Sequence, residues 1–118
     1  MDHSRRVFLT PRDAHEPCQW FDAQAATKYE EDTYFNGNNH ISVATGCQWE
    51  HETLYKTATG SWIMYSYSNM QGSRESYYAM DLAEAVPWLI KNNHDPSDLG
   101  LTAEQLAKAE KIVADLEV

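Results

Sequence analysis

The fold is decided by residues 48–80, which read QWEHETLYKTATGSWIMYSYSNMQGSRESYYAM. Residues 48–57 alternate as a β-strand does, with Trp49 and His51 on one face and Glu50 and Glu52 on the other. The TATG sequence that follows is typical of a hairpin turn. The two later parts of the segment are rich in tyrosine and other β-forming residues. The segment therefore predicts three consecutive antiparallel strands joined by short connections.

The residues before this segment predict further elements. NGNN at residues 36–39 is a turn signal, and residues 41–44 form a short strand that completes a four-stranded meander. Asp22 is a suitable N-cap for a short helix over residues 23–30, because the alanines there favour a helix. The acidic run that ends this helix opposes the helix dipole, so we expect the helix end to fray. Residues 7–9 predict a short first strand.

Two helices are predicted after the strands. Asp81 and Glu84 have the spacing of a capping box, and an apolar stripe follows them. Pro87 removes one backbone hydrogen bond from this helix and is expected to kink it. Thr102 and Gln105 form a second capping box at the start of a C-terminal helix.

The chain of 118 residues is long enough for one domain with a modest core. Aromatic residues make up 12% of it, and each of them buries a large area when it is packed inside. The sequence therefore predicts a single α+β domain over residues 1–118. Its expected architecture is a four-stranded antiparallel β-meander with helices packed on one face and a C-terminal helix.

The charge of the chain is strongly acidic and unevenly spread. Eighteen Asp and Glu residues against nine Lys and Arg residues give a net charge of −9. Residues 13–55 contain eight acids and one base, Lys28, for a net charge of −7. Such a field repels nucleic acid and anionic membranes and favours basic partners. Solubility alone is the other interpretation of the same charge.

The sequence predicts a cytoplasmic protein. It contains no apolar run of membrane-spanning length. Residues 4–9 resemble the start of a twin-arginine export signal, but polar, proline-broken residues follow where that signal needs an apolar stretch of about 7–15 residues. In the cytoplasm Cys18 and Cys47 are expected to be reduced, with a disulfide between them as an open alternative.

Residue types that bind zinc are present at unsuitable spacings. They are His15, Cys18, His40, Cys47 and His51. On one strand, Cys47 and His51 would lie about 13 Å apart, and paired CxxC spacing is absent. A glycine-rich phosphate loop is absent as well. We therefore expect neither a metal site nor a cofactor.

The strongest catalytic pattern is a general acid–base set. His51 lies between Glu50 and Glu52, His40 follows the NGNN turn, and Arg74 belongs to a polar loop. A histidine together with a carboxylate and an arginine is suited to phosphoester cleavage. A half-buried histidine bonded to a neighbouring strand is common and is the stronger explanation of His51. A small hydrolase that uses His40, Glu50, His51 and Arg74 is therefore the alternative function.

Five short sequences between residues 20 and 94 resemble a group of small, mostly uncharacterised bacterial proteins. They are NHIS (39–42), QWEHETLY (48–55), GSW (60–62), QGSRESYY (71–78) and WLIKNNH (88–94). The range covers about two-thirds of the chain. The resemblance implies a bacterial or mobile-element origin, and no functional residue is carried over from it.

Size and charge favour a non-catalytic acidic interaction protein. The prediction is a regulator or inhibitor that occupies a basic surface, in the manner of antitoxins or of phage-encoded, anti-CRISPR-like inhibitors of nucleic-acid-binding machinery. The expected partner is a basic protein, without direct contact to nucleic acid or membrane, and the oligomeric state is open. The candidate contact residues are Glu30, Glu31, Asp32, Glu50 and Glu52.

Overall fold

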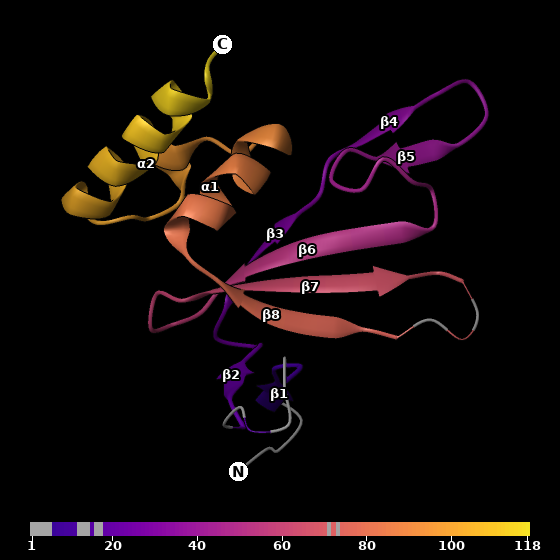
Figure 1. The fold of residues 1–118 in the computed structure, drawn as a ribbon, viewed down its shortest axis with the longest axis horizontal. Helices are drawn as coiled ribbons and strands as arrows, with labels where there is room; N and C mark the ends of the chain where they lie inside the picture. The colour runs from indigo at the N-terminus through magenta and orange to yellow at the C-terminus, as the bar shows by residue number, and fades with distance from the viewer. Residues whose placement is uncertain (1–5, 12–14, 16–17, 71, 73) are drawn as a thin grey trace.

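A computed structural model describes residues 6–11, 15, 18–70, 72 and 74–118, and it combines strands with helices in an α+β arrangement (Figure 1). Three antiparallel sheets are formed, one of four strands and two of two strands. The strands are β1 (Arg6–Phe8), β2 (Trp20–Asp22), β3 (Thr27–Glu30), β4 (Thr33–Phe35), β5 (His40–Ser42), β6 (Glu50–Lys56), β7 (Trp62–Ser68) and β8 (Ser76–Met80). The helices are α1 (Leu82–Lys91), the short 3₁₀ helix η2 (Pro96–Asp98) and α2 (Ala103–Leu116).

The three strands expected from residues 48–80 are present as β6, β7 and β8. They pair in sequence order, with Leu54 opposite Met64 and Tyr65 opposite Tyr77. The TATG turn is also confirmed, because the Thr57 amide donates to the Ser61 carbonyl at 2.8 Å. Strand β6 begins at Glu50, two residues later than the alternation indicated.

The expectation of a single four-stranded meander is wrong. The central sheet has the order β3-β6-β7-β8, so its fourth strand comes from residues before the turn NGNN. The predicted strand at residues 41–44 is β5, which pairs with β4 in a separate two-stranded sheet. β4 and β5 are called the arm below, and Figure 1 shows the arm rising away from the central sheet at the end opposite α2.

The predicted helix over residues 23–30 is also absent. Asp22 does act as a local cap, since its Oδ1 accepts from the amides of Gln24 at 3.0 Å and Ala25 at 3.2 Å. The chain then leaves this turn and forms β3, which pairs with β6 over all four residues of the strand. An isolated helix of eight residues is only marginally stable in water. As strand β3, residues 27–30 gain hydrogen bonds and packing from the sheet instead.

The main core lies between α1 and one face of the central sheet, called the helix face. Leu54, Trp62 and Met64 project from β6 and β7 and pack against Trp88 and Leu89 of α1. Trp62 is only 4% exposed. The capping box at the start of α1 is confirmed, and the helix continues through Pro87 to Lys91.

The end of α1 closes the free edge of β3. Asn92 is buried and bonds on both sides, donating to the Trp88 carbonyl at 2.8 Å and accepting from the Asp32 amide at 2.9 Å. His94 Nε2 donates to the Glu30 carbonyl at 2.7 Å. These side chains satisfy backbone groups that an edge strand otherwise exposes to another chain.

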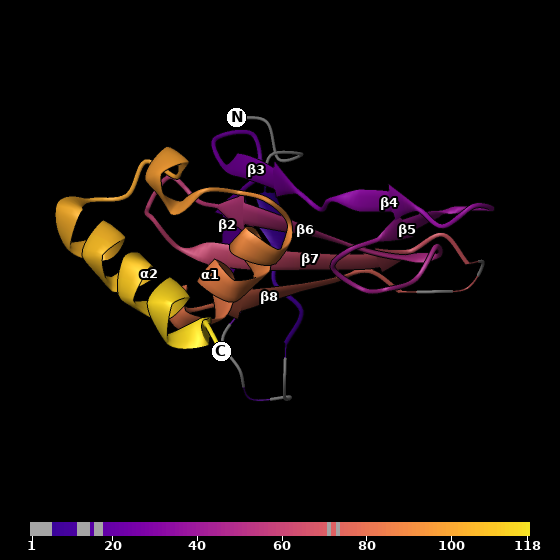
Figure 2. The same ribbon diagram turned by 90° about the horizontal axis from the view of Figure 1, so that it is seen from above.

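Helix α2 packs on α1 and forms the outermost layer (Figure 2). Its predicted capping box at Thr102 and Gln105 is confirmed. The connection that leads into it is held by Lys56, whose Nζ donates to the carbonyls of Leu99 at 2.9 Å and Gly100 at 3.1 Å. Among the described residues, no helix has both the length and the apolar character needed to cross a membrane.

The opposite side of the central sheet, called the outer face, is partly covered by β1 and β2, which form the N-terminal ribbon. Phe21 is buried there, with its ring centroid 5.3 Å from that of Tyr55 and 6.0 Å from that of Tyr77. The Thr10 amide also donates to the Tyr77 carbonyl at 2.8 Å. Figure 1 shows the helices above the sheet and this ribbon below it.

Candidate functional site

The candidate site is the half of the helix face that α1 leaves open. Two depressions of about 340 and 520 Å³ lie there, and Glu52 and Ser66 line both of them. We call the combined feature the trough. Its position follows from the register, because Glu50 is opposite Ser68 and Glu52 is opposite Ser66, so all four belong to one face.

Three carboxylates and several hydroxyl groups line the trough. Glu50 is exposed, whereas Glu52 is half-buried and accepts from Trp88 Nε1 at 3.2 Å. Glu84 enters from the first turn of α1, where its side chain also accepts from the Asp81 amide. Arg74 is the one Lys or Arg among the described residues that line it. The trough is therefore an acidic, hydrogen-bonding surface.

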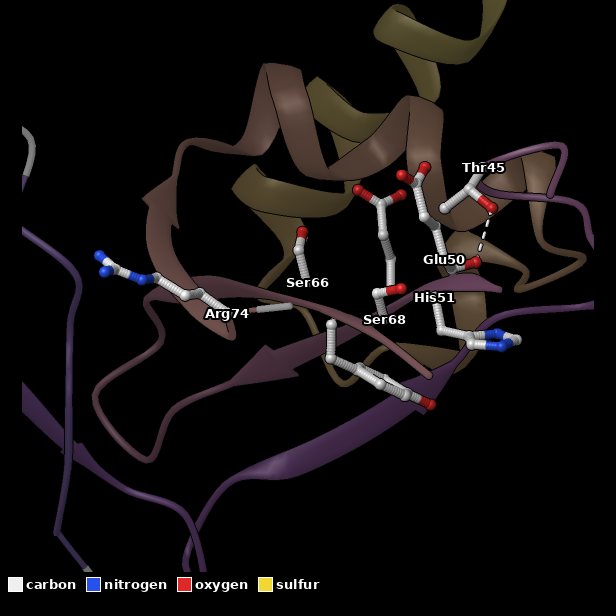
Figure 3. A pocket seen from close by; sticks show the side chains of 8 residues that line it. Thr45, Glu50, His51, Ser66, Ser68 and Arg74 are labelled. Carbon is white, nitrogen blue, oxygen red and sulfur yellow. Dashed lines mark hydrogen bonds between the residues drawn. The ribbon is translucent and has the colours of Figure 1, made fainter. Parts of the chain in front are cut away.

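Three residues of the predicted hydrolase, Glu50, His51 and Arg74, line the smaller depression of the trough, but their functional groups do not converge there. Figure 3 shows the Glu50 carboxylate and the His51 ring on opposite sides of β6, as alternation along a strand requires. The Arg74 side chain points away from both of them (Figure 3). His40 lies on the arm, where its ring centroid is 5.2 Å from that of Phe35. The structure thus places three of the four candidates around one depression with their functional groups pointing apart, and it places His40 elsewhere.

His51 is paired instead with Glu31, which belongs to the acidic run expected at the frayed end of the predicted helix. The distance from Glu31 Oε1 to His51 Nδ1 is 2.6 Å, and the two side chains are only 10% and 17% exposed. Ser42 Oγ donates to the other oxygen of the same carboxylate, and the Glu52 backbone amide donates to it as well. Glu31 therefore joins β3, β5 and β6. Nothing in the local sequence indicates this contact, since the partners are 20 residues apart.

The surroundings of Glu31 and His51 determine the pKa shift of the carboxyl group and the position of the imidazole proton. Burial raises the pKa of the Glu31 carboxyl above its usual value, and the hydrogen bond from His51 offsets only part of that rise. On its other side, His51 Nε2 lies 3.2 Å from Asn69 Nδ2. An amide donor at Nε2 fits a ring that carries its proton on Nδ1 and donates it to Glu31. The His51 ring also stacks on Tyr67, with centroids 5.3 Å apart.

The five acids predicted to contact a partner divide into two groups. Glu30 and Glu50 are exposed, and Glu30 forms a surface ion pair with Lys28 at 3.7 Å. Glu31 and Glu52 are engaged in the bonds described above. Asp32 accepts from the Thr33 amide at 2.9 Å and from the Asn93 side chain, which ties the exit of β3 to the end of α1. Of the five acids, Glu30 and Glu50 are the two that can face a partner without breaking an internal hydrogen bond.

The cysteines are both free thiols, so the alternative of a disulfide between them is not realised. Cys47 lies in the turn before β6, where its sulfur accepts from the Trp49 amide at 3.4 Å. Within the part of the chain that the structure describes, no three His, Cys, Asp or Glu side chains are grouped as metal ligands.

Comparison with known proteins adds no assignment to this geometry. No family model, no curated protein and no solved structure matches the chain. The function is therefore inferred from the site itself.

Proposed function

We propose that this chain is a non-catalytic acidic interaction protein of the cytoplasm that binds a basic protein partner as a regulator or inhibitor. The observation that carries the proposal is the trough, which combines Glu50 and Glu52 of β6 with Glu84 of α1 around two neighbouring depressions. Inhibitors of the antitoxin and anti-CRISPR kinds, which cover nucleic-acid-binding surfaces, have the size and charge that this role requires.

The chemistry of the trough suits Lys and Arg side chains. Carboxylates accept strong, charge-assisted hydrogen bonds from ammonium and guanidinium groups, and arginine donates to them in pairs. The serine hydroxyls beside them, at Ser66 and Ser68, accept further hydrogen bonds. The net charge of −9 would also speed the approach of a basic protein at low salt. A basic segment laid along the trough therefore fits both its shape and its charge.

The test starts from a partner captured on the immobilised chain from an extract of the source organism and identified by mass spectrometry. With that partner purified, Glu50→Lys should raise the Kd at least about tenfold, and the Kd of the wild type should rise with salt. Glu110→Lys is the matched control, because Glu110 is exposed on the far helix α2. If the two variants bind the partner with equal Kd, the trough is not part of the interface.

Glu30→Lys is a second variant whose Kd for the partner is measured in the same experiment. Its side chain belongs to the outer face, because Glu30 is opposite Thr53 rather than opposite a residue of the helix face. A partner confined to the trough should lose little affinity with this variant. A loss as large as that of Glu50→Lys would indicate that the partner wraps around β3 to both faces.

The alternative of a small hydrolase is kept because of one contact. A half-buried carboxylate that accepts from His Nδ1, as Glu31 does from His51, orients an imidazole so that Nε2, once released from its contact with Asn69, is able to take a proton. In this version Glu31 replaces Glu50 as the partner of the histidine. The protein would then cleave a phosphoester or ester probe such as p-nitrophenyl phosphate or p-nitrophenyl acetate, and His51→Gln would abolish the activity. Equal rates for the wild type and His51→Gln would reject this function.

A further inference from the structure

The arm carries aromatic side chains that the fold leaves outside. Tyr34 is 52% exposed and Phe35 is 60% exposed, although both belong to a paired strand. Ile41, which is opposite Tyr34, is buried and packs against the rest of the fold. Among the rings of the described residues, that of His40 is the one in contact with the Phe35 ring. Large exposed aromatics of this kind are the residues that most often anchor protein interfaces.

The arm is held rigid at its tip. Asn36 Oδ1 accepts from the amides of Asn38 and Asn39, each at 2.9 Å, and the Asn36 amide donates to the Asn39 carbonyl at 3.1 Å. Gly37 has a φ of +102°, which glycine adopts without strain. The NGNN turn is therefore a closed structure that sets the register of β4 and β5.

The root of the arm is fixed as firmly as its tip. Ser42 Oγ donates to the buried Glu31 carboxylate, and the Val43 amide donates to the Asp32 carbonyl at 2.9 Å. An element that is already ordered loses little conformational entropy on binding, so its aromatic contacts contribute more fully to affinity.

The end of the molecule that bears the arm is acidic and carries further apolar groups. Residues 29–55 contain five acids and no Lys or Arg. Trp49 is 48% exposed and Met70 is 58% exposed, and the Asn69 amide beside Met70 donates to the Trp49 carbonyl at 2.8 Å. Apolar anchors framed by carboxylates complement an apolar cleft framed by basic residues.

We propose that the arm enters an apolar cleft bordered by Lys and Arg on the partner protein, with Phe35 and Tyr34, which project from opposite faces of β4, against its two walls. This inference depends on the proposed function, which supplies the basic partner, and it adds the element that anchors the complex. The trough then supplies charge contacts beside that anchor.

The chain offers a matched control for the test. Phe8 and Phe35 are each the last residue of a three-residue strand in a two-stranded sheet, and their exposures are 54% and 60%. The experiment measures the Kd of the purified basic partner, identified as above, for the wild type, Phe35→Ala and Phe8→Ala. We expect Phe35→Ala to raise the Kd at least about tenfold and Phe8→Ala to change it less than about twofold. Circular dichroism and urea unfolding of each variant show whether the fold is retained.

Each other outcome has a definite meaning. If Phe35→Ala binds as tightly as Phe8→Ala while Glu50→Lys binds weakly, the arm is not the anchor and the proposed function stands. If the captured protein is acidic, or if no protein binds in a salt-dependent way, the proposed function fails as well. If sedimentation shows a dimer of the wild type that Phe35→Ala converts to a monomer, the arm contacts a second copy of this chain, and the cleft proposal is overturned.

Discussion

The N-terminal ribbon and the arm are built alike but attach to the central sheet in different ways. Each has two antiparallel strands of three residues, one buried side chain in its middle pair and exposed rings in an end pair. In the ribbon the buried residue is Phe21, which packs on the tyrosines of the outer face. The arm is fastened at its root by hydrogen bonds from Ser42 and Val43.

This difference explains why one element covers the sheet and the other projects from it. The stabilisation from apolar burial grows with the area that is removed from water, so packing of Phe21 keeps the ribbon against the sheet. Hydrogen bonds need only a few well-placed atoms, so Glu31 and Asp32 hold the arm at one end and leave its rings in solvent. In this molecule the apolar attachment gives a cover, and the polar attachment gives a projecting element.

Phe21→Ala should have the largest effect of the four changes considered. It removes a buried ring and leaves a cavity between the ribbon and the sheet, so the free energy of unfolding should fall by about 3–5 kcal/mol. Urea unfolding measures this loss. Phe8→Ala, at an exposed site on the same ribbon, is the control and should cost less than about 0.5 kcal/mol. Equal losses from the two variants would mean that Phe21 does not attach the ribbon.

Glu31→Ala should have the next largest effect, because it removes the polar attachment of the arm. The change leaves Ser42, His51 and the Glu52 amide without their acceptor, and we expect a loss of about 2–3 kcal/mol. Hydrogen exchange should become faster in β4 and β5, while the amides of β7 stay protected. Unchanged exchange in the arm would show that its root does not depend on Glu31.

The same carboxylate should make stability depend on pH. Because the pKa of Glu31 is raised in the folded state, mainly by burial, the folded chain holds this proton more tightly than the unfolded chain does. Its stabilising contribution is complete below the unfolded value of about 4.5 and is lost as the pH rises through the folded pKa. The stability of the wild type relative to Glu31→Gln should therefore fall over that window. Urea titrations at several pH values test the sign, and a rising difference would contradict it.

The smallest effect on stability should come from Phe35→Ala. The ring is exposed and contacts His40 alone among the rings of the described residues, so the loss should stay below about 0.5 kcal/mol. A near-zero change in the free energy of unfolding would distinguish the arm from the ribbon most clearly. The same substitution, Phe35→Ala, is expected to weaken partner binding strongly. A loss comparable to that of Phe21→Ala would show that the arm has a packing role.

The five predicted contact acids show that the distribution of charge along the sequence does not tell exposed carboxylates from those bonded within the fold. Sequence position identified an acidic stretch, and two of its members, Glu30 and Glu50, do face solvent. No local pattern distinguishes these two from the other three acids. Glu31, Asp32 and Glu52 form hydrogen bonds with Ser42, Asn93 and Trp88 respectively. Burial of a carboxylate depends on donors from distant parts of the chain, and local composition does not contain that information. Asp13 and Glu16, which belong to the same stretch, lie outside the described residues.

Local patterns by themselves determined β6, β7, β8, the TATG turn and both capped helices. Alternation, turn residues and capping boxes act within a few residues, so their signal is readable in the chain. Only the tertiary structure decided that Thr27–Glu30 is a strand, despite a helix cap at Asp22, because the hydrogen bonds to β6 outweigh a short helix. It alone also placed Glu31 against His51 and left Phe35 in solvent, because both depend on contacts between segments far apart in sequence.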